Sequence, residues 1–164
     1  MKYVLLGSFF LSFNVFSGTT VFNDELDEFT DERGIFIGLI GDEHNSYLSQ
    51  LIGIYCDAGK LRMGINKGPI VDNDPTLAVT LRFDKNKPIN HEFYHNSEYL
   101  VSRNIDFIKL FIKELRNSNN LIVRIEGDGK IMRFTDLKDS GKHVAEFMNA
   151  ASEMPPSQCN IFQR

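Results

Sequence analysis

The chain of 164 residues contains no tryptophan, only two cysteines, five prolines and no run of basic residues. With a formal net charge of −4, it lacks the positive surface expected of a protein that binds nucleic acid or an anionic membrane. It also has no Gly-rich phosphate loop and no Gly-x-Ser-x-Gly nucleophile elbow. Because tryptophan is missing, the core must rest on the 14 phenylalanines and on branched aliphatic residues. No set of residues compels assignment to an enzyme class.

The one long apolar run lies at the start of the chain. Residues 1–17 (MKYVLLGSFFLSFNVFS) combine an early cation, an apolar stretch and small residues at its end, which is the pattern of a signal peptide cut ahead of Gly18. A membrane anchor would need about 20 apolar residues, and polar residues interrupt this run. No cysteine stands at the cut, so we expect no lipid attachment. The sequence therefore predicts a periplasmic or secreted protein that does not insert in a membrane after cleavage.

Both cysteines, Cys56 and Cys159, remain after that cleavage. In an oxidising compartment an even pair most simply forms one disulfide. It would close a loop of about 100 residues and stabilise the fold by up to ~4.7 kcal/mol on the chain-entropy estimate. Two separate buried thiols are the alternative. The spacing resembles neither a metal site nor a Cys-x-x-Cys redox motif, and we expect no cofactor.

The rest of the chain predicts one domain. Residues 18–33 are acidic and weakly periodic, and we expect a loose N-terminal arm or a short helix there. Apolar or alternating runs predict strands at 34–41, 47–56, 60–65 and 76–84, an extended segment at 92–102, a hairpin at 121–134, and helices after Asn104 and at about 139–151. The fold class expected for residues 34–164 is α+β, with antiparallel β-sheets of about six to eight strands, two helices and one disulfide.

The sequence predicts an apolar helix followed by a tight β-hairpin in residues 104–136. The helix carries many apolar residues and should be packed on most sides; they are Ile105, Phe107, Ile108, Leu110, Phe111, Ile112 and Leu115. In the hairpin, Asp128-Gly129 is typical of a two-residue type I′ turn. Counting outward from that turn pairs Ile125 with Met132, Val123 with Phe134, and Arg124 with Arg133.

Two arginines directly opposite each other, Arg124 and Arg133, would destabilise a hairpin unless an anion lies over them. Arg82, from another strand, extends this basic stripe, and Arg62 is a further candidate. The stripe predicts a binding face for a carboxylate, a phosphate or an acidic partner, because guanidinium groups bind such anions in a bidentate manner. The alternative is neutralisation within the protein, by Glu126, by Asp136 or by the acidic arm.

The segment His91-Glu92-Phe93-Tyr94-His95 matches the His-Glu-x-x-His pattern of zinc peptidases. That pattern works on a helix, where His91 and His95 would share a face and Glu92 would activate a zinc-bound water. Pro88 and the aromatic residues favour an extended segment instead, in which the two histidines lie about 13 Å apart. A small zinc hydrolase, with Glu114 as a possible third ligand, is thus an alternative to surface histidines beside aromatic core residues.

Several segments in order resemble the VasI/TagO-type family of periplasmic accessory proteins linked to type VI secretion. They are IGIYC, KLRMGI, LRFD, FIKLFIKEL, LIVRIEGDGK, MRFTDLKDSGKHVAEFM and the late cysteine, spread from Leu51 to Cys159. The family pattern has a Trp where this chain has Phe93 or Tyr94. The resemblance implies an exported, non-catalytic accessory or binding protein with a protein partner in the cell envelope. An inhibitor or immunity-type protein that occupies another protein's site is the third reading of the sequence.

Overall fold

The computed structural model describes residues 19–26, 33–41, 51–66, 74–96, 99–127 and 129–154, together with Cys159. The expected signal peptide and most of the turn after Gly41 lie outside these residues. The described part forms eleven elements: β1 Thr19–Leu26, β2 Arg33–Ile40, β3 Leu51–Asp57, β4 Lys60–Asn66, β5 Thr76–Phe83, β6 Ile89–Asn96, β7 Tyr99–Ser102, α1 Ile105–Asn117, β8 Leu121–Ile125, β9 Ile131–Phe134 and α2 Ser140–Glu153.

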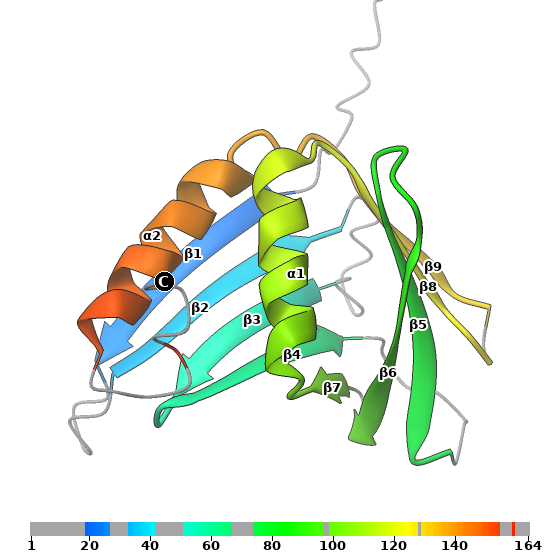
Figure 1. Ribbon diagram of the computed structural model, residues 1–164, viewed down its shortest axis with the longest axis horizontal. Coiled ribbons are helices and arrows are strands. Elements are labelled where there is room, and N and C mark those ends of the chain that lie inside the picture. The colour runs from blue at the N-terminus through cyan, green and yellow to red at the C-terminus, as the bar shows by residue number, and fades with distance from the viewer. Residues whose placement is uncertain are drawn as a thin grey trace, which may run out of the picture.

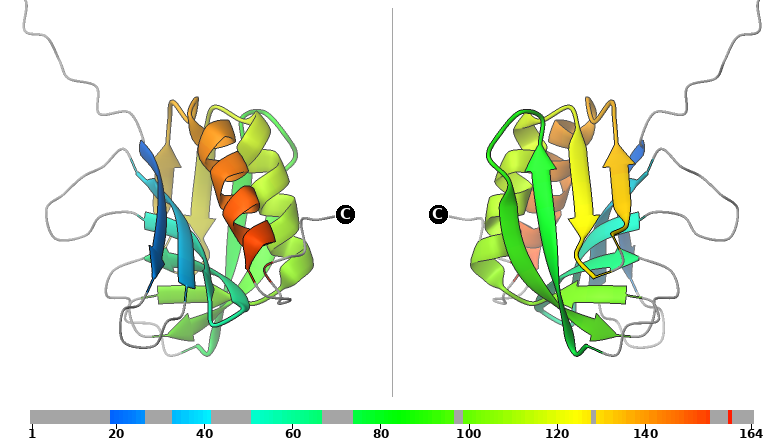
Figure 2. Two further views of the ribbon diagram at one scale, coloured as in Figure 1. Left: turned by 90° about the vertical axis from the view of Figure 1, so that its left-hand side faces the viewer. Right: turned by 90° about the vertical axis from the view of Figure 1, so that its right-hand side faces the viewer.

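All the strands belong to one antiparallel sheet with the order β1-β2-β3-β4-β7-β6-β5-β8-β9. Figures 1 and 2 show that this sheet curves strongly and that both helices lie on its concave side. The expected α+β class with two helices is confirmed. The expected strand count is too low, because the described chain has nine strands. One unforeseen strand is β1, and another arises because the segment 92–102 divides into β6 and β7.

The expectation of a loose acidic arm is wrong for β1. This strand pairs with β2 along its full length, from Thr19 opposite Ile40 to Leu26 opposite Arg33. Arg33 also binds the carboxylates of Asp24 at 2.6 Å and of Glu153 at 3.2 Å. The hydrogen bond from Arg33 lowers the pKa of Asp24. Main-chain pairing and these ion pairs therefore fix a segment whose side chains are too polar to predict a strand.

The core lies between the concave face of the sheet and the two helices. Helix α1 contributes five buried side chains to this core: Phe107, Ile108, Phe111, Ile112 and Leu115. Leu110 is 38% exposed, so α1 is not packed on most sides as expected. In α2 the buried Ser140 donates its hydroxyl proton to the carbonyl of Leu115 at 2.8 Å, which joins the start of α2 to the end of α1. In the part of the chain that the structure describes, no helix is long and apolar enough to cross a bilayer.

On the convex face of β2, β3 and β4, two aromatic side chains of the sheet lie over a row of glycines. Three glycines form a cross-strand row there, with Gly53 between Gly38 and Gly64. The ring of Phe36 lies so close to Gly38 and Gly53 that a Cβ on either glycine would clash with it. Tyr55 covers Gly64 in the same way at ordinary contact distance. Aromatic rings therefore cover the glycine row, whereas Ile122 and Ile131 are exposed on β8 and β9.

Candidate functional site

The hairpin of β8 and β9 has a register that differs from the expected one. Ile122 pairs with Arg133 and Arg124 pairs with Ile131, so the two arginines are not directly opposite. Left-handed backbone occurs at Gly127 (φ 96°) and Gly129 (φ 66°), in the turn between the two strands. The Ile125 N–H donates to the Lys130 carbonyl at 2.9 Å and closes it. Asp128, half of the expected two-residue turn, lies outside the described residues.

This register places an isoleucine between two arginines. On β5, Arg82 pairs with Ile122, and Ile122 pairs on its other side with Arg133. We call these three residues the arginine row. Since neighbouring strands lie about 4.8 Å apart, the Cα atoms of the two arginines are separated by roughly 10 Å. All three side chains are exposed on the convex face, where the right-hand view of Figure 2 shows β5, β8 and β9 in front of the helices.

Arg124 and the arginine row differ in their partners. Arg124 binds the Glu126 carboxylate through Nη2 at 2.9 Å and Nε at 3.0 Å. The charge of Arg124 is therefore neutralised within the protein by Glu126, which is the alternative that the sequence left open. Arg82 and Arg133 have neither an ion pair nor a hydrogen bond from their side chains to any residue that the structure describes. Asp136, the other expected neutraliser, binds Lys138 at 3.0 Å. The basic stripe predicted from the sequence is thus reduced to Arg82 and Arg133.

Apolar surface and a pocket adjoin the arginine row. Ile122 is 39% exposed and Ile131 is 41% exposed, which is high for branched aliphatic side chains. A pocket of about 540 Å³ begins at Ile122 and Arg133 and extends to Lys85 at the end of β5. Asp84 also lines it, but the Asp84 carboxylate accepts from the backbone N–H groups of residues 119 and 120, at 3.2 Å and 2.9 Å. The positive charges of Arg133 and Lys85 therefore remain available to an anion.

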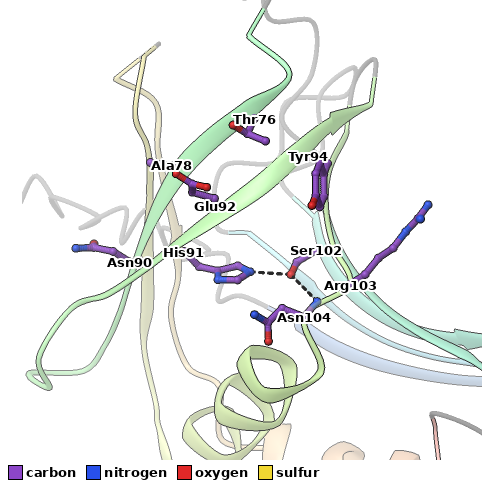
Figure 3. Close-up of a pocket in the computed structure, with 9 residues that line it drawn as sticks. All are labelled: Thr76, Ala78, Asn90, His91, Glu92, Tyr94, Ser102, Arg103 and Asn104. Atoms are coloured by element: carbon purple, nitrogen blue, oxygen red, sulfur yellow. Dashed lines mark hydrogen bonds between the residues drawn. The ribbon is translucent and has the colours of Figure 1, made fainter.

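The His-Glu-x-x-His segment lies on a strand, β6. Figure 3 shows His91 pointing toward Ser102, and its Nε2 is 2.8 Å from the Ser102 hydroxyl. Strand alternation places Glu92 on the opposite face from both histidines. The Nδ1 atom of His95 lies 3.3 Å from the carbonyl of Asp74. The two histidines therefore cannot share an ion with Glu92 beside them.

Further candidate ligands do not assemble around this segment. Glu114, the suggested third ligand, accepts a hydrogen bond from the Asn86 amide at 3.0 Å. Across the described ranges, no group of three His, Cys, Asp or Glu side chains is placed to hold a metal ion.

His91 and Ser102 form a part-buried polar contact that the sequence did not suggest. The imidazole of His91 stacks on Phe107 with ring centroids 3.8 Å apart, and burial lowers the pKa of His91. Ser102 also accepts a hydrogen bond at 3.2 Å from the N–H of Asn104, which is the N-cap residue of α1. A pocket of about 710 Å³ opens beside these groups. Because Ser102 is only 1% exposed, its hydroxyl ties β6 and β7 to α1 and is poorly placed to attack a substrate.

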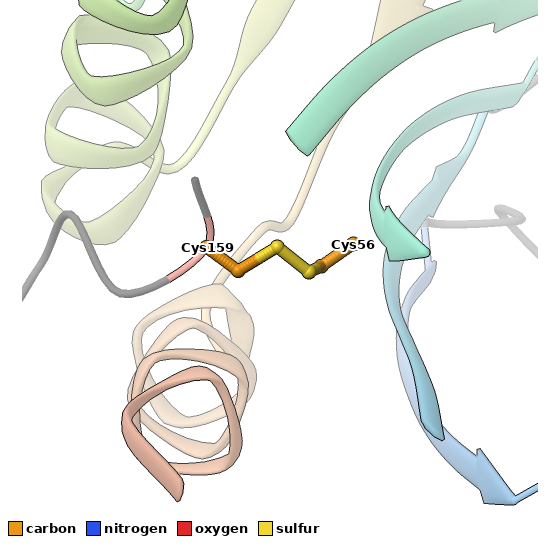
Figure 4. Close-up of a disulfide and its surroundings, with 2 residues drawn as sticks. All are labelled: Cys56 and Cys159. Carbon is orange, nitrogen blue, oxygen red and sulfur yellow. A yellow bond between two sulfur atoms is a disulfide. The ribbon is translucent and has the colours of Figure 1, made fainter. Parts of the chain in front are cut away.

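Cys56 and Cys159 form the predicted disulfide. Figure 4 shows the bond joining the end of β3 to the chain beyond α2, and the two Cα atoms are 6.0 Å apart. Both residues are 0% exposed, and they are separated by 103 positions in the sequence. Neither sulfur can therefore act as a nucleophile or a metal ligand.

Comparisons with protein-family models, with curated proteins and with solved structures find no match to this chain.

Proposed function

We propose that this chain is an exported, non-catalytic binding protein of the cell envelope that holds an acidic segment of a partner protein on the arginine row. The observation that carries the proposal is the row itself, in which Arg82 and Arg133 flank the exposed Ile122. No described residue binds either guanidinium group. Both are therefore available for bidentate bonds to carboxylates.

The geometry defines the chemistry of the partner. A carboxylate over each arginine, with an apolar side chain over Ile122 between them, would complement the row in charge and in shape. The carboxylates would lie roughly 10 Å apart along a line that crosses the strands, so they come from two neighbouring extended parts of the partner. The chain as a whole has a formal net charge of −4, so this basic region stands out from an acidic protein. It favours an acidic partner over a basic one.

Two features support placement outside the cytoplasm. A buried disulfide such as Cys56–Cys159 is typical of proteins in oxidising compartments. The pattern of residues 1–17 is that of a signal peptide. Together with the resemblance to VasI/TagO-type proteins, these features support an accessory role in the envelope or in a secretion system. An inhibitor or immunity-type protein would use the same surface, and the identity of the partner distinguishes the two roles.

A zinc hydrolase built on the His-Glu-x-x-His segment has no comparable support. On strand β6 the general base Glu92 points away from the face that carries His91 and His95. A hydrolase would also need an open coordination site that faces a cleft. We therefore do not propose catalysis at His91.

In-cell cross-linking tests the proposed function. A photoreactive residue replaces Ile122 in the full chain, and we expect a cross-link to one defined partner. The double charge reversal Arg82→Glu/Arg133→Glu should abolish that cross-link. The control is Lys109→Glu/Lys113→Glu on α1, which changes the net charge equally and should preserve it. A cross-link that survives reversal of the row, or one lost equally in both variants, would show that the row does not bind the partner.

A further inference from the structure

The arginine row ends at an open edge of the sheet. Strand β9 is the last strand in the sheet order and pairs only with β8. In an antiparallel pair, residues alternate between those that bond the neighbouring strand and those whose N–H and C=O point outward. The Ile125 N–H bonds the Lys130 carbonyl, so the inward set continues with Met132 and Phe134. The main-chain groups of Ile131 and Arg133 therefore point away from the sheet.

No described strand pairs with the outer edge of β9, and β8 is the described element that it contacts extensively. Helix α2 contacts β1 and β2, at the opposite end of the strand order from β9, and α1 contacts β4. Figure 1 shows β9 on the outside of the sheet, far from β1. An uncovered edge with exposed apolar side chains is a template for another strand unless charge or shape protects it. In β9 the only charged side chain is Arg133, which repels a basic strand and attracts an acidic one.

We propose that β9 accepts an extended acidic segment of the partner as an additional strand of the sheet. The proposal deepens the proposed function and rests on it. The N–H and C=O groups of Ile131 and Arg133 supply main-chain hydrogen bonds, which give affinity that does not depend on the side chains of the partner. The side chains on the convex face supply selectivity, because cross-strand neighbours lie only about 5 Å apart.

The register of β9 predicts the pattern of the incoming strand. The residue opposite Arg133 is acidic and continues the arginine row by one position. The residue two positions away on the same face lies opposite Ile131 and is apolar. Beyond Arg133, the pocket of about 540 Å³ presents Lys85 to a second acidic side chain. The partner segment therefore has the sequence pattern acidic-x-apolar, in which the acidic and the apolar side chain share the convex face and x points to the other face.

A second copy of this chain fits the edge less well than a separate partner. The acidic strand available from a copy is β1, which carries Asp24 and Glu25. Asp24 is already held by Arg33 at 2.6 Å, and Glu25 accepts a hydrogen bond from Asn23 at 2.7 Å. Pairing β1 with β9 would also be a head-to-tail contact, which generates rings or open filaments instead of a two-fold dimer. We therefore favour a separate acidic segment.

The test uses a peptide probe with the full-length mature chain. The probe is a capped peptide containing two repeats of Glu-Thr-Val-Thr, titrated to millimolar concentration while backbone amides are followed by NMR. We expect the amides of Ile131 and Arg133 to become protected from hydrogen exchange. N-methylation of alternate peptide amides should weaken binding about tenfold in one frame and little in the other, because only one frame faces β9.

A variant of the edge provides an independent readout. Ile131→Pro removes an outward N–H that bonds nothing in the sheet, a position at which edge strands tolerate proline. It should weaken peptide binding about tenfold, whereas Ile131→Thr keeps the N–H and should preserve most of it. The N-methylated peptides need no protein variant, so they decide the question even if Ile131→Pro fails to fold.

The outcomes separate this inference from the proposed function. If the peptide fails to bind, or binds equally in both N-methylated frames without protecting Ile131 and Arg133, strand addition is wrong. The cross-linking test of the arginine row is unaffected by that result. If the two amides are protected but Arg82→Glu/Arg133→Glu binds the peptide as well as wild type, the row is not the determinant and the proposed function fails. Self-association that is lost in Ile131→Pro would identify a second copy as the occupant and overturn the proposal.

Discussion

Arg82 and Arg133 both pair with Ile122, one from each side, although they belong to different hairpins. The sheet thus holds two guanidinium groups at a fixed separation with an exposed apolar side chain between them. Neither group takes part in holding the fold through an ion pair or hydrogen bond to the described residues. Exposed charged residues with no structural partner can usually be replaced at little cost to the fold.

The first prediction concerns the stability of variants in the row. Arg82→Gln/Arg133→Gln should leave the free energy of unfolding within about 0.5 kcal/mol of wild type, because no described contact is lost. Urea unfolding followed by circular dichroism measures it. The same variant should lose partner binding in the cross-linking experiment. A large loss of stability would mean that the two arginines maintain the sheet and would contradict a role confined to binding.

The second prediction concerns the disulfide. Cys56→Ser should lower the free energy of unfolding by about 2–5 kcal/mol, since a long loop would be released in the unfolded chain. Urea unfolding provides the value. Cys56→Ser/Cys159→Ser controls for reactions of the remaining thiol and should be destabilised to a similar extent. Two free thiols in the native wild-type protein, or an unchanged unfolding midpoint, would contradict the bond.

The third prediction concerns pH. Burial lowers the pKa of His91 below its usual value of 6.5, so the folded protein binds a proton there less readily than the unfolded chain. The stabilising contribution of neutral His91 is therefore complete above about pH 6.5 and is lost as the pH falls toward the folded-state pKa.

Urea unfolding between pH 7.5 and 5 measures this dependence. His91→Gln keeps an amide that can bond the Ser102 hydroxyl and should flatten the loss of stability on acidification. His95→Gln is the matched substitution on the same strand and should retain it. An unchanged pH dependence in His91→Gln would mean that another group is responsible.

Local patterns predicted much of the fold because burial alternates regularly in the relevant elements. In β5, buried and outward residues alternate along the strand as expected from Leu77, Val79 and Leu81. The helix α1 begins after Asn104, whose side chain accepts from the Phe107 N–H at 3.0 Å. These features depend on neighbours in sequence and can be read from it.

The remaining features depend on distant contacts or on the details of one turn. Strand β1 is fixed by pairing with β2 and by the ion pairs of Arg33, neither of which appears as a hydrophobic pattern. The hairpin register depends on left-handed backbone at Gly127 as well as at Gly129. The expected and observed registers differ by two positions, so Arg124 and Arg133 still share a face. Only the observed register brings Ile122 between Arg82 and Arg133.

The fourth prediction concerns the row of glycines on the convex face of β2, β3 and β4, where the ring of Phe36 lies over Gly53. Gly53→Ala would place a Cβ against the ring of Phe36, so the ring would have to turn away from both Gly53 and Gly38, which it covers. We expect a loss of about 1–3 kcal/mol in the free energy of unfolding, the usual range for overpacking. Gly34→Ala is the matched control, because a Cβ there meets nothing within 4 Å.

The double variant Phe36→Val/Gly53→Ala tests the cause of that loss. With a smaller side chain at position 36 the clash disappears, so the double variant should lose less stability than the sum of the two single variants. Additive losses would mean that Gly53→Ala acts through the backbone and not through the ring. A Gly53→Ala variant as stable as wild type would show that the ring of Phe36 moves off the glycine row at little cost.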